Sequence, residues 1–83
     1  MTEFSKTVYN MVKDIRCGQT MTYAEVARAV GKPRAYRAVG NALNKNHDPS
    51  VPCQRVVRSD GHIGGYNRGA GLKEKLLREE DAI

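Results

Sequence analysis

The amino-acid sequence predicts a mainly α-helical domain with a small two-stranded wing, in a winged helix-turn-helix arrangement. Three observations support this fold class: an amphipathic helical pattern opens the chain, two helical segments follow with a glycine between them, and two short β-prone runs flank a turn. With 83 residues, 40% of them hydrophobic and 28% charged, we expect a single domain, residues 1–83, around one core.

The first helix is predicted from apolar side chains that recur at helical spacing: Phe4, Val8, Met11, Val12 and Ile15. Thr2 or Ser5 is expected to cap its start, and Gly18 to end it. Cys17 lies near that end with no base beside it in the sequence, so we expect it to be structural.

A helix-turn-helix is predicted from the next segment. Thr22 and Glu25 have the spacing of a capping box, and Gly31 is expected to end the helix that they begin. Pro33 suits the first turn of a second helix, which we expect to run to about Leu43.

The second of these helices is expected to bury one face, made of Ala35, Ala38, Val39, Ala42 and Leu43. Its other face carries basic and amide groups: Arg34, Arg37, Asn41, Asn44 and Lys45. Gly40 costs a helix about 1 kcal/mol relative to alanine, and it lets the backbone approach another surface closely. This combination suits a helix that presses against nucleic acid; the alternative is a surface helix with incidental basic residues.

Two short strands and a last helix are predicted in the remainder. Val56–Val57 and His62–Tyr66 are the β-prone runs, with a turn over residues 58–61, and together they would form the wing. A glycine-rich loop follows over residues 67–71. The last helix is indicated by an apolar stripe of Leu72, Leu76 and Leu77.

The charge is concentrated in the middle of the chain, which carries +5 overall. Seven Lys or Arg residues lie from Arg28 to Arg58, where Asp48 is the single acid. Such a basic centre is typical of a polyanion-binding face, the alternative being a solvated basic surface without a ligand. No apolar run approaches the ~20 residues of a membrane span and no secretory pattern opens the chain, so we expect a cytoplasmic protein without membrane association.

Cys53 is the candidate reactive group. Pro52 stiffens the approach to it, and the strand-like Val56–Val57 fixes the other side. Rigid mounting suits a nucleophilic thiol; the alternative is that Cys53 is a small hydrophobe in the core. The spacings of the cysteine and histidine residues match no common zinc motif, so we expect no metal.

The stretch Val51-Pro52-Cys53-Gln54-Arg55-Val56-Val57 resembles the active-site signature of the O6-alkylguanine-DNA alkyltransferases, usually Pro-Cys-His-Arg-Val. The resemblance continues, in the family's order, at Thr22-Tyr23, residues 36–43, Asn46, Gly61, Gly64-Gly65-Tyr66, Gly69, Leu72-Lys73, Leu76-Leu77 and Glu80. It covers nearly the whole chain, but not the family's small first domain. The major departure is Gln54, which stands where the family has histidine.

This resemblance implies repair of DNA by a protein that flips O6-alkylguanine out of the duplex and moves the alkyl group permanently onto its own cysteine. Cys53 would be the acceptor, and Arg37 would fill the gap left by the base. Tyr23 would crowd the target phosphate and donate a proton to the leaving guanine. Asn46 would brace the recognition helix, which lies in the minor groove, against the active-site loop.

The resemblance also implies a wider binding set. Tyr66 matches the tyrosine that lines the base pocket, and Asn67 stands where many members have serine. The remaining residues that we expect to contact DNA or the base are Arg34, Gly40, Asn41 and Arg55.

Gln54 and Glu80 match a relay in which a glutamate orients a histidine that acts through water on the cysteine. Glutamine accepts no proton at neutral pH, so we expect transfer to be slower by ~10²–10⁴-fold. Arg55 is expected to offset part of this loss by lowering the pKa of Cys53, and Gln54 to keep the bond to Glu80.

Three functions are open on the sequence alone. The leading one is a single-turnover alkyltransferase. The alternative is an alkyltransferase-like protein that binds O6-alkylguanine, transfers nothing and recruits excision-repair proteins. The third is a winged-helix transcription regulator indifferent to alkylation. For the first two we expect double-stranded DNA as the partner, no cofactor and a monomer.

Overall fold

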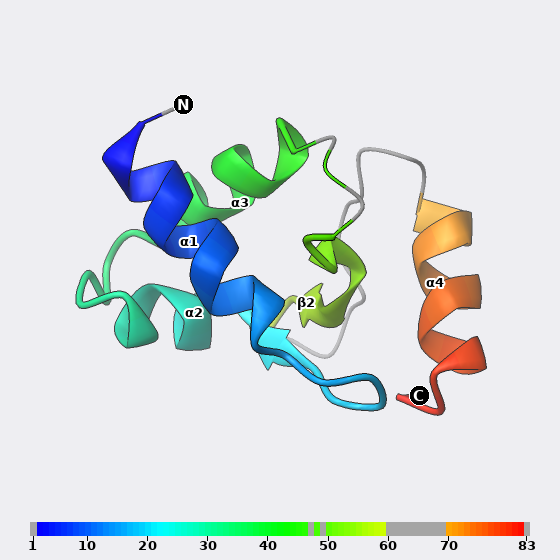
Figure 1. Ribbon diagram of the computed structural model, residues 1–83. Coiled ribbons are helices and arrows are strands. Elements are labelled where there is room, and N and C mark those ends of the chain that lie inside the picture. The colour runs from blue at the N-terminus through cyan, green and yellow to red at the C-terminus, as the bar shows by residue number, and fades with distance from the viewer. Residues whose placement is uncertain (1, 47, 49, 60–69, 83) are drawn as a thin grey trace.

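The computed structural model describes residues 2–46, 48, 50–59 and 70–82, and Figure 1 shows the arrangement of these segments. Their helices are α1 (Glu3–Lys13), α2 (Tyr23–Ala29), α3 (Tyr36–Asn44), α4 (Ala70–Glu79) and the short 3₁₀ turn η1 (Cys53–Arg55). Two short strands, β1 (Met21–Thr22) and β2 (Val56–Val57), form a parallel sheet. The mainly helical fold class is therefore confirmed.

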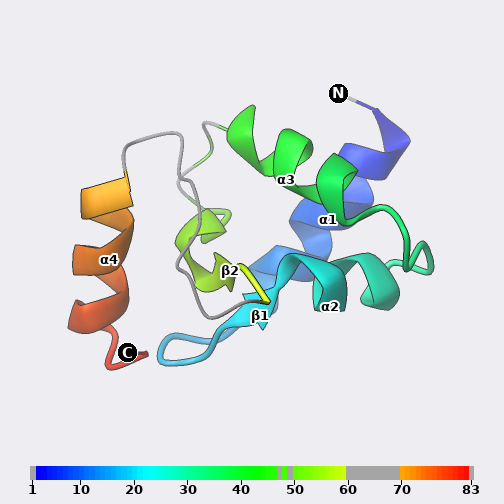
Figure 2. The same cartoon turned by 180° about the vertical axis from the view of Figure 1, so that it is seen from behind.

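The hydrophobic core lies where α1, α2 and α3 pack on one another, with η1 and β2 closing it from the side (Figures 1 and 2). The three helices and β2 contribute fully buried valines: Val8, Val12, Val26, Val39 and Val56. Val8 and Val12 are four residues apart in α1, and this helical spacing explains why the sequence pattern located that helix.

Helix α1 begins and ends for separate local reasons. Thr2 is its N-cap, because its hydroxyl oxygen accepts a hydrogen bond of 3.0 Å from the Ser5 amide. The helix ends at Lys13, earlier than the expected stop at Gly18, which instead takes φ +87° in the turn beyond. Ile15 is still buried after the helix has ended.

The capping box at the start of α2 is confirmed. The Glu25 amide donates to the Thr22 hydroxyl at 3.0 Å, and the Thr22 amide donates to the Glu25 carboxylate at 2.9 Å. Gly31 follows the helix with φ +81°, a conformation that glycine adopts without strain.

Helix α3 begins at Tyr36 and not at Pro33, which corrects the sequence prediction. The Ala35 amide donates to the Lys32 carbonyl at 2.9 Å, so Pro33 occupies the second position of a turn that precedes the helix. Ala38 is exposed, contrary to expectation, because the buried stripe of α3 is confined to Val39, Ala42 and Leu43.

The strand at Val56–Val57 is confirmed, but its described partner was not foreseen. β2 pairs in parallel with β1, so that Met21 lies opposite Val56 and Thr22 opposite Val57. The expected hairpin partner, residues 62–66, lies outside the described residues, as do residues 60 and 61 of the turn before it. Parallel pairing joins remote segments without a local turn, so no short-range signal announces it.

Helix α4 stands on the far side of η1 and β2 from α1, α2 and α3 (Figures 1 and 2). It turns Lys73 and Leu77 inward, and both are fully buried. Among the described residues, no helix has the length and apolar character needed to cross a membrane.

Candidate functional site

Cys53 occupies a fixed position at the first residue of η1, between Pro52 and the strand β2. Its side chain is buried, with 6% of the residue exposed. The Asn46 side-chain amide nitrogen, Nδ2, donates to the Cys53 sulfur at 3.0 Å, and the carbonyl oxygen of Leu43 lies 4.0 Å from the same sulfur. The thiol is therefore part of the core and also in contact with polar groups at the end of α3.

Asn46 links α3 to the segment that carries the cysteine. It is 7% exposed, and its Nδ2 donates both to Cys53 and to the Asp48 carbonyl, the latter at 3.1 Å. Its Oδ1 accepts a hydrogen bond of 3.1 Å from the Asp48 amide. Both ends of this side chain are engaged, which suits the bracing role that the resemblance implies.

Gln54 and Glu80 are joined as expected. The Gln54 Nε2 donates to the Glu80 carboxylate at 3.0 Å. Arg55 donates to the same carboxylate from Nε at 2.8 Å and from Nη2 at 3.2 Å. The bond from Arg55 and, to a smaller extent, that from Gln54 hold the pKa of Glu80 below its ordinary value, against the opposing effect of burial.

Arg55, which was predicted to contact DNA, bonds protein groups in this structure. Besides Glu80, its guanidinium donates from Nη1 to the Ile15 carbonyl at 2.9 Å. The pKa of Arg55 is raised, chiefly by its hydrogen bond to Glu80. These bonds direct the guanidinium toward Glu80 and the Ile15 carbonyl, so its charge is largely committed to one carboxylate.

Lys73 is a site residue that sequence reasoning did not single out. It is fully buried, and its Nζ donates to the Val56 carbonyl at 2.6 Å and lies 3.5 Å from the Tyr23 hydroxyl. The same nitrogen is 5.6 Å from the centre of the Tyr23 ring. Its spacing of four residues before Leu77 on α4 was a signal that it faces inward.

The ionisable groups around Lys73 act on one another. Burial lowers the pKa of Lys73 to about 8, while the nearby Cys53 acts in the opposite direction. Burial also raises the pKa of Tyr23, and Cys53 adds to this shift. The tyrosine, the lysine and the cysteine therefore form one electrostatic unit, contributed by α2, α4 and η1.

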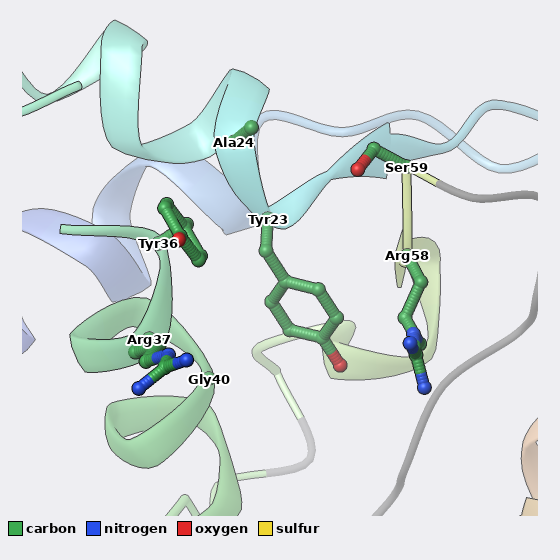
Figure 3. A pocket seen from close by; sticks show the side chains of 7 residues that line it. All are labelled: Tyr23, Ala24, Tyr36, Arg37, Gly40, Arg58 and Ser59. Carbon is green, nitrogen blue, oxygen red and sulfur yellow. The ribbon is translucent and has the colours of Figure 1, made fainter. Parts of the chain in front are cut away.

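A pocket of about 400 Å³ opens beside this unit (Figure 3). Three segments line it, through Tyr23, Ala24, Tyr36, Arg37, Gly40, Arg58 and Ser59. Gly40 forms part of the α3 wall: a Cβ built on it would lie 3.8 Å from the Tyr23 ring, an ordinary contact. Cys53 is not among the residues that line this pocket.

The remaining predicted residues fall into two groups. Arg34 and Asn41 are exposed, the first in the turn before α3 and the second on that helix. Tyr66 and Asn67 lie outside the described residues. Cys17, expected to be structural, is exposed. In the described part of the chain, no group of three or more potential ligands is placed to hold a metal ion.

The fold and site define a helix-turn-helix domain of the DNA-binding class, with a buried cysteine in contact with the end of α3. A protein-family model described as "6-O-methylguanine DNA methyltransferase, DNA binding domain" matches residues 3–82, so the chain belongs to this family.

Similarity to individual relatives extends over nearly the whole chain. A methylated-DNA–protein-cysteine methyltransferase of Methanosarcina barkeri is 48% identical over 81 residues, covering 96% of this chain and 51% of the relative. The bifunctional transcriptional activator/DNA repair enzyme Ada of Escherichia coli is 44% identical over 80 residues, covering 95% of this chain and 23% of the relative. The chain thus spans about half the length, or less, of the curated relatives that it matches.

Solved structures show the same fold. Mycobacterium tuberculosis OGT in complex with DNA matches with a TM-score of 0.94 at 37% identity, covering 99% of this chain and 51% of that chain. S. pombe Atl1, in complex with damaged DNA containing O6-carboxymethylguanine, matches with a TM-score of 0.85 at 40% identity, covering 96% and 77%.

Proposed function

We propose that this protein binds duplex DNA in the minor groove, flips O6-alkylguanine out of the helix and transfers the alkyl group irreversibly to Cys53. The observation that carries the proposal is the 3.0 Å contact between Asn46 and the Cys53 sulfur, because it fixes a buried thiol to the end of the helix that faces the pocket. A thiol that only filled the core would need no such polar partner.

The DNA-facing surface would be the wall of the pocket formed by α2 and α3. Arg37 is exposed there and has the length to enter the duplex in place of a flipped base. Gly40 leaves that part of the helix without a side chain, so the DNA backbone can approach closely. Extrusion of the base is necessary because the O6 atom lies inside the base stack.

The transfer step conserves atoms and charge. The Cys53 thiolate attacks the alkyl carbon, the new C–S bond forms as the C–O6 bond breaks, and the electron pair passes to the guanine ring. Tyr23 donates its hydroxyl proton to a ring nitrogen of the departing base. Lys73, whose Nζ lies 3.5 Å from that hydroxyl, returns a proton to Tyr23. The thiol proton passes to solvent when the thiolate forms, and Lys73 recovers a proton from solvent after the step. In total, the thiol loses one proton and guanine gains one.

Gln54 limits the rate of this reaction. Its bond to Glu80 keeps the geometry of a relay, but an amide takes no proton from the thiol or from an intervening water. Transfer would therefore be slower than with a histidine at this position, by ~10²–10⁴-fold. A protein that acts once tolerates slow chemistry better than one that must turn over.

The alternative function is recognition without transfer, in which the protein binds O6-alkylguanine and recruits excision repair. Two observations favour it: the missing base at Gln54, and the fold shared with Atl1, which was solved with damaged DNA. Cys53 favours transfer, since a protein that only binds has no need of a fixed thiol next to the site.

Intact-mass measurement after incubation with duplex DNA containing O6-methylguanine separates the two functions. Transfer predicts the mass gain of one methyl group, located on the peptide that contains Cys53, with Cys17 unchanged as an internal control. The Cys53→Ala variant is expected to bind the lesion and gain no mass. Lesion binding without a mass gain in the wild-type chain would establish the alternative, and an equal gain in Cys53→Ala would exclude Cys53 as the acceptor.

A further inference from the structure

The register of the small parallel sheet brings two remote residues together. Thr22 lies opposite Val57, and both strands end at this pair and run in the same direction. The next residue on each chain, Tyr23 after β1 and Arg58 after β2, therefore leaves the sheet at the same level. The pairing of the two strands thus fixes the spacing between a tyrosine and a guanidinium.

The side chains of Tyr23 and Arg58 also lie near each other. Figure 3 shows the Tyr23 ring and the Arg58 side chain extending in the same direction from their two segments, with Ser59 beside Arg58. All three residues line the pocket. The Arg58 charge is close enough to Tyr23 to oppose the rise in the pKa of that phenol that burial and Cys53 produce. Arg37 lies on the other side of the Tyr23 ring, on α3.

We propose that Arg58, with the Tyr23 hydroxyl, forms a seat for one phosphodiester group next to the flipped nucleotide, called here the phosphate seat (Tyr23, Arg58 and Ser59). This inference rests on the proposed function and assigns a separate task to each guanidinium of the pocket. Arg37 enters the duplex, and Arg58 holds the DNA backbone in the rotated position that flipping requires.

The chemistry of the seat matches a phosphodiester. A guanidinium offers parallel N–H donors that fit two phosphate oxygens, and it remains charged at every accessible pH. Ser59 is exposed and lines the same pocket, and its hydroxyl offers a further donor near the backbone of Arg58 (Figure 3). A phenol on the opposite side cannot replace that charge, but it crowds the phosphate into one orientation. The strands fix the backbone at both residues in advance, so the order lost on binding is that of the side chains.

The test measures binding of the full chain, at one fixed salt concentration, to a duplex with a single O6-methylguanine. Each of the two phosphates flanking the lesion is replaced in turn by an uncharged methylphosphonate. Arg58→Gln is expected to lower affinity for the O6-methylguanine duplex that has no methylphosphonate by roughly 10- to 100-fold, which is the value of a charged hydrogen bond. For one methylphosphonate duplex, wild type and Arg58→Gln should bind equally. Arg58→Lys keeps the positive charge but lacks the parallel N–H donors of the guanidinium, so its affinity should lie between those of wild type and Arg58→Gln.

Arg28→Gln is the matched control, because Arg28 is exposed on α2 and does not line the pocket. Loss of the Arg28 charge should weaken binding to all three duplexes by the same factor. An Arg58→Gln defect that is also equal on all three duplexes, or no defect at all, would overturn the phosphate seat while the proposed function stands. Equal wild-type affinity for methylated and unmethylated duplexes would overturn the proposed function, and the seat with it.

Discussion

The side-chain nitrogen of Asn46 lies 3.0 Å from the sulfur of Cys53, and this contact joins the end of α3 to the segment that carries the thiol. Because the same amide also bonds the backbone of Asp48 through both of its ends, it cannot turn away without breaking three hydrogen bonds. We therefore expect a movement of α3 on DNA binding to shift the sulfur as well.

Asn46→Ala is expected to impair both stability and transfer. Removing a buried amide with these partners should cost about 1–3 kcal/mol in the free energy of unfolding, measured by urea denaturation. Methyl transfer should fall further than stability accounts for, because the sulfur loses its polar restraint. Asn10→Ala, at an exposed position on α1, is the control and should transfer at the wild-type rate. Wild-type transfer by Asn46→Ala would remove Asn46 from the site.

Arg37→Ala is expected to reduce capture of the flipped base more than it reduces general affinity for DNA. The comparison is the ratio of affinities for methylated and unmethylated duplexes, measured by fluorescence anisotropy at constant salt. Arg34→Ala removes an equal charge from the turn before α3, outside the pocket, and should lower both affinities in proportion. If the two variants gave the same ratio, Arg37 would not be the residue that replaces the base.

Gly40→Ala separates DNA contact from folding. The new methyl group would meet the Tyr23 ring at 3.8 Å without a clash, and alanine favours a helix over glycine by about 1 kcal/mol. The variant should therefore be as stable as wild type or slightly more so, as thermal unfolding would show. Its affinity for duplex DNA should nevertheless fall, because the methyl group stands on the surface that approaches the backbone. Unchanged affinity would place the DNA elsewhere.

Gln54→His is expected to raise the rate of methyl transfer, by up to ~10²–10⁴-fold, if the absence of a base limits the reaction. The imidazole would lie beside Glu80, which raises a histidine pKa, so the gain should decrease as the pH falls through that raised value. Single-turnover rates between pH 5 and 9 measure both effects. Gln19→His, at an exposed position, controls for the added imidazole; no gain in Gln54→His would show that another step is limiting.

Lys73→Met tests the buried ammonium through the pH dependence of stability. Lys73 has a pKa of about 8 when folded and 10.5 in its ordinary state, so between these values the unfolded chain binds more protons. Wild-type stability relative to the variant should therefore rise with pH from 8 to 10.5, by up to about 3 kcal/mol. Lys75→Met, at an exposed position of α4, is the control for loss of a lysine from the same helix. Parallel curves for wild type and Lys73→Met would mean that Lys73 is not held in a low-dielectric site.

Local signals in the sequence located the elements of this fold well. The capping box at Thr22 and Glu25 and the valine spacing of α1 depend on neighbours within one or two helical turns, so they can be read from the chain alone. Pro33 misled the prediction because proline suits both a first helical turn and a β-turn, and packing decides between them.

The site was only partly accessible to sequence reasoning, because its contacts join distant segments. The bond between Gln54 and Glu80 was expected from a family pattern, and the structure contains it. No local pattern indicated that β1 pairs with β2, and so the neighbourhood of Tyr23 and Arg58 could not be inferred. Lys73 was overlooked because a lysine is normally counted as a surface residue, although the helical repeat turned it inward.

Arg55 has a consequence for how a cysteine signature should be interpreted and reused. Its guanidinium fastens the exit of the first helix, at Ile15, to the last turn of the chain, at Glu80. The residues around the thiol thus include one, Arg55, that holds the fold together in addition to those proposed to act in the reaction. A protein engineer who grafted residues 52–57 onto a foreign scaffold would import an arginine without its partners. One who removed Glu80 would also loosen the segment that follows α1, at Ile15.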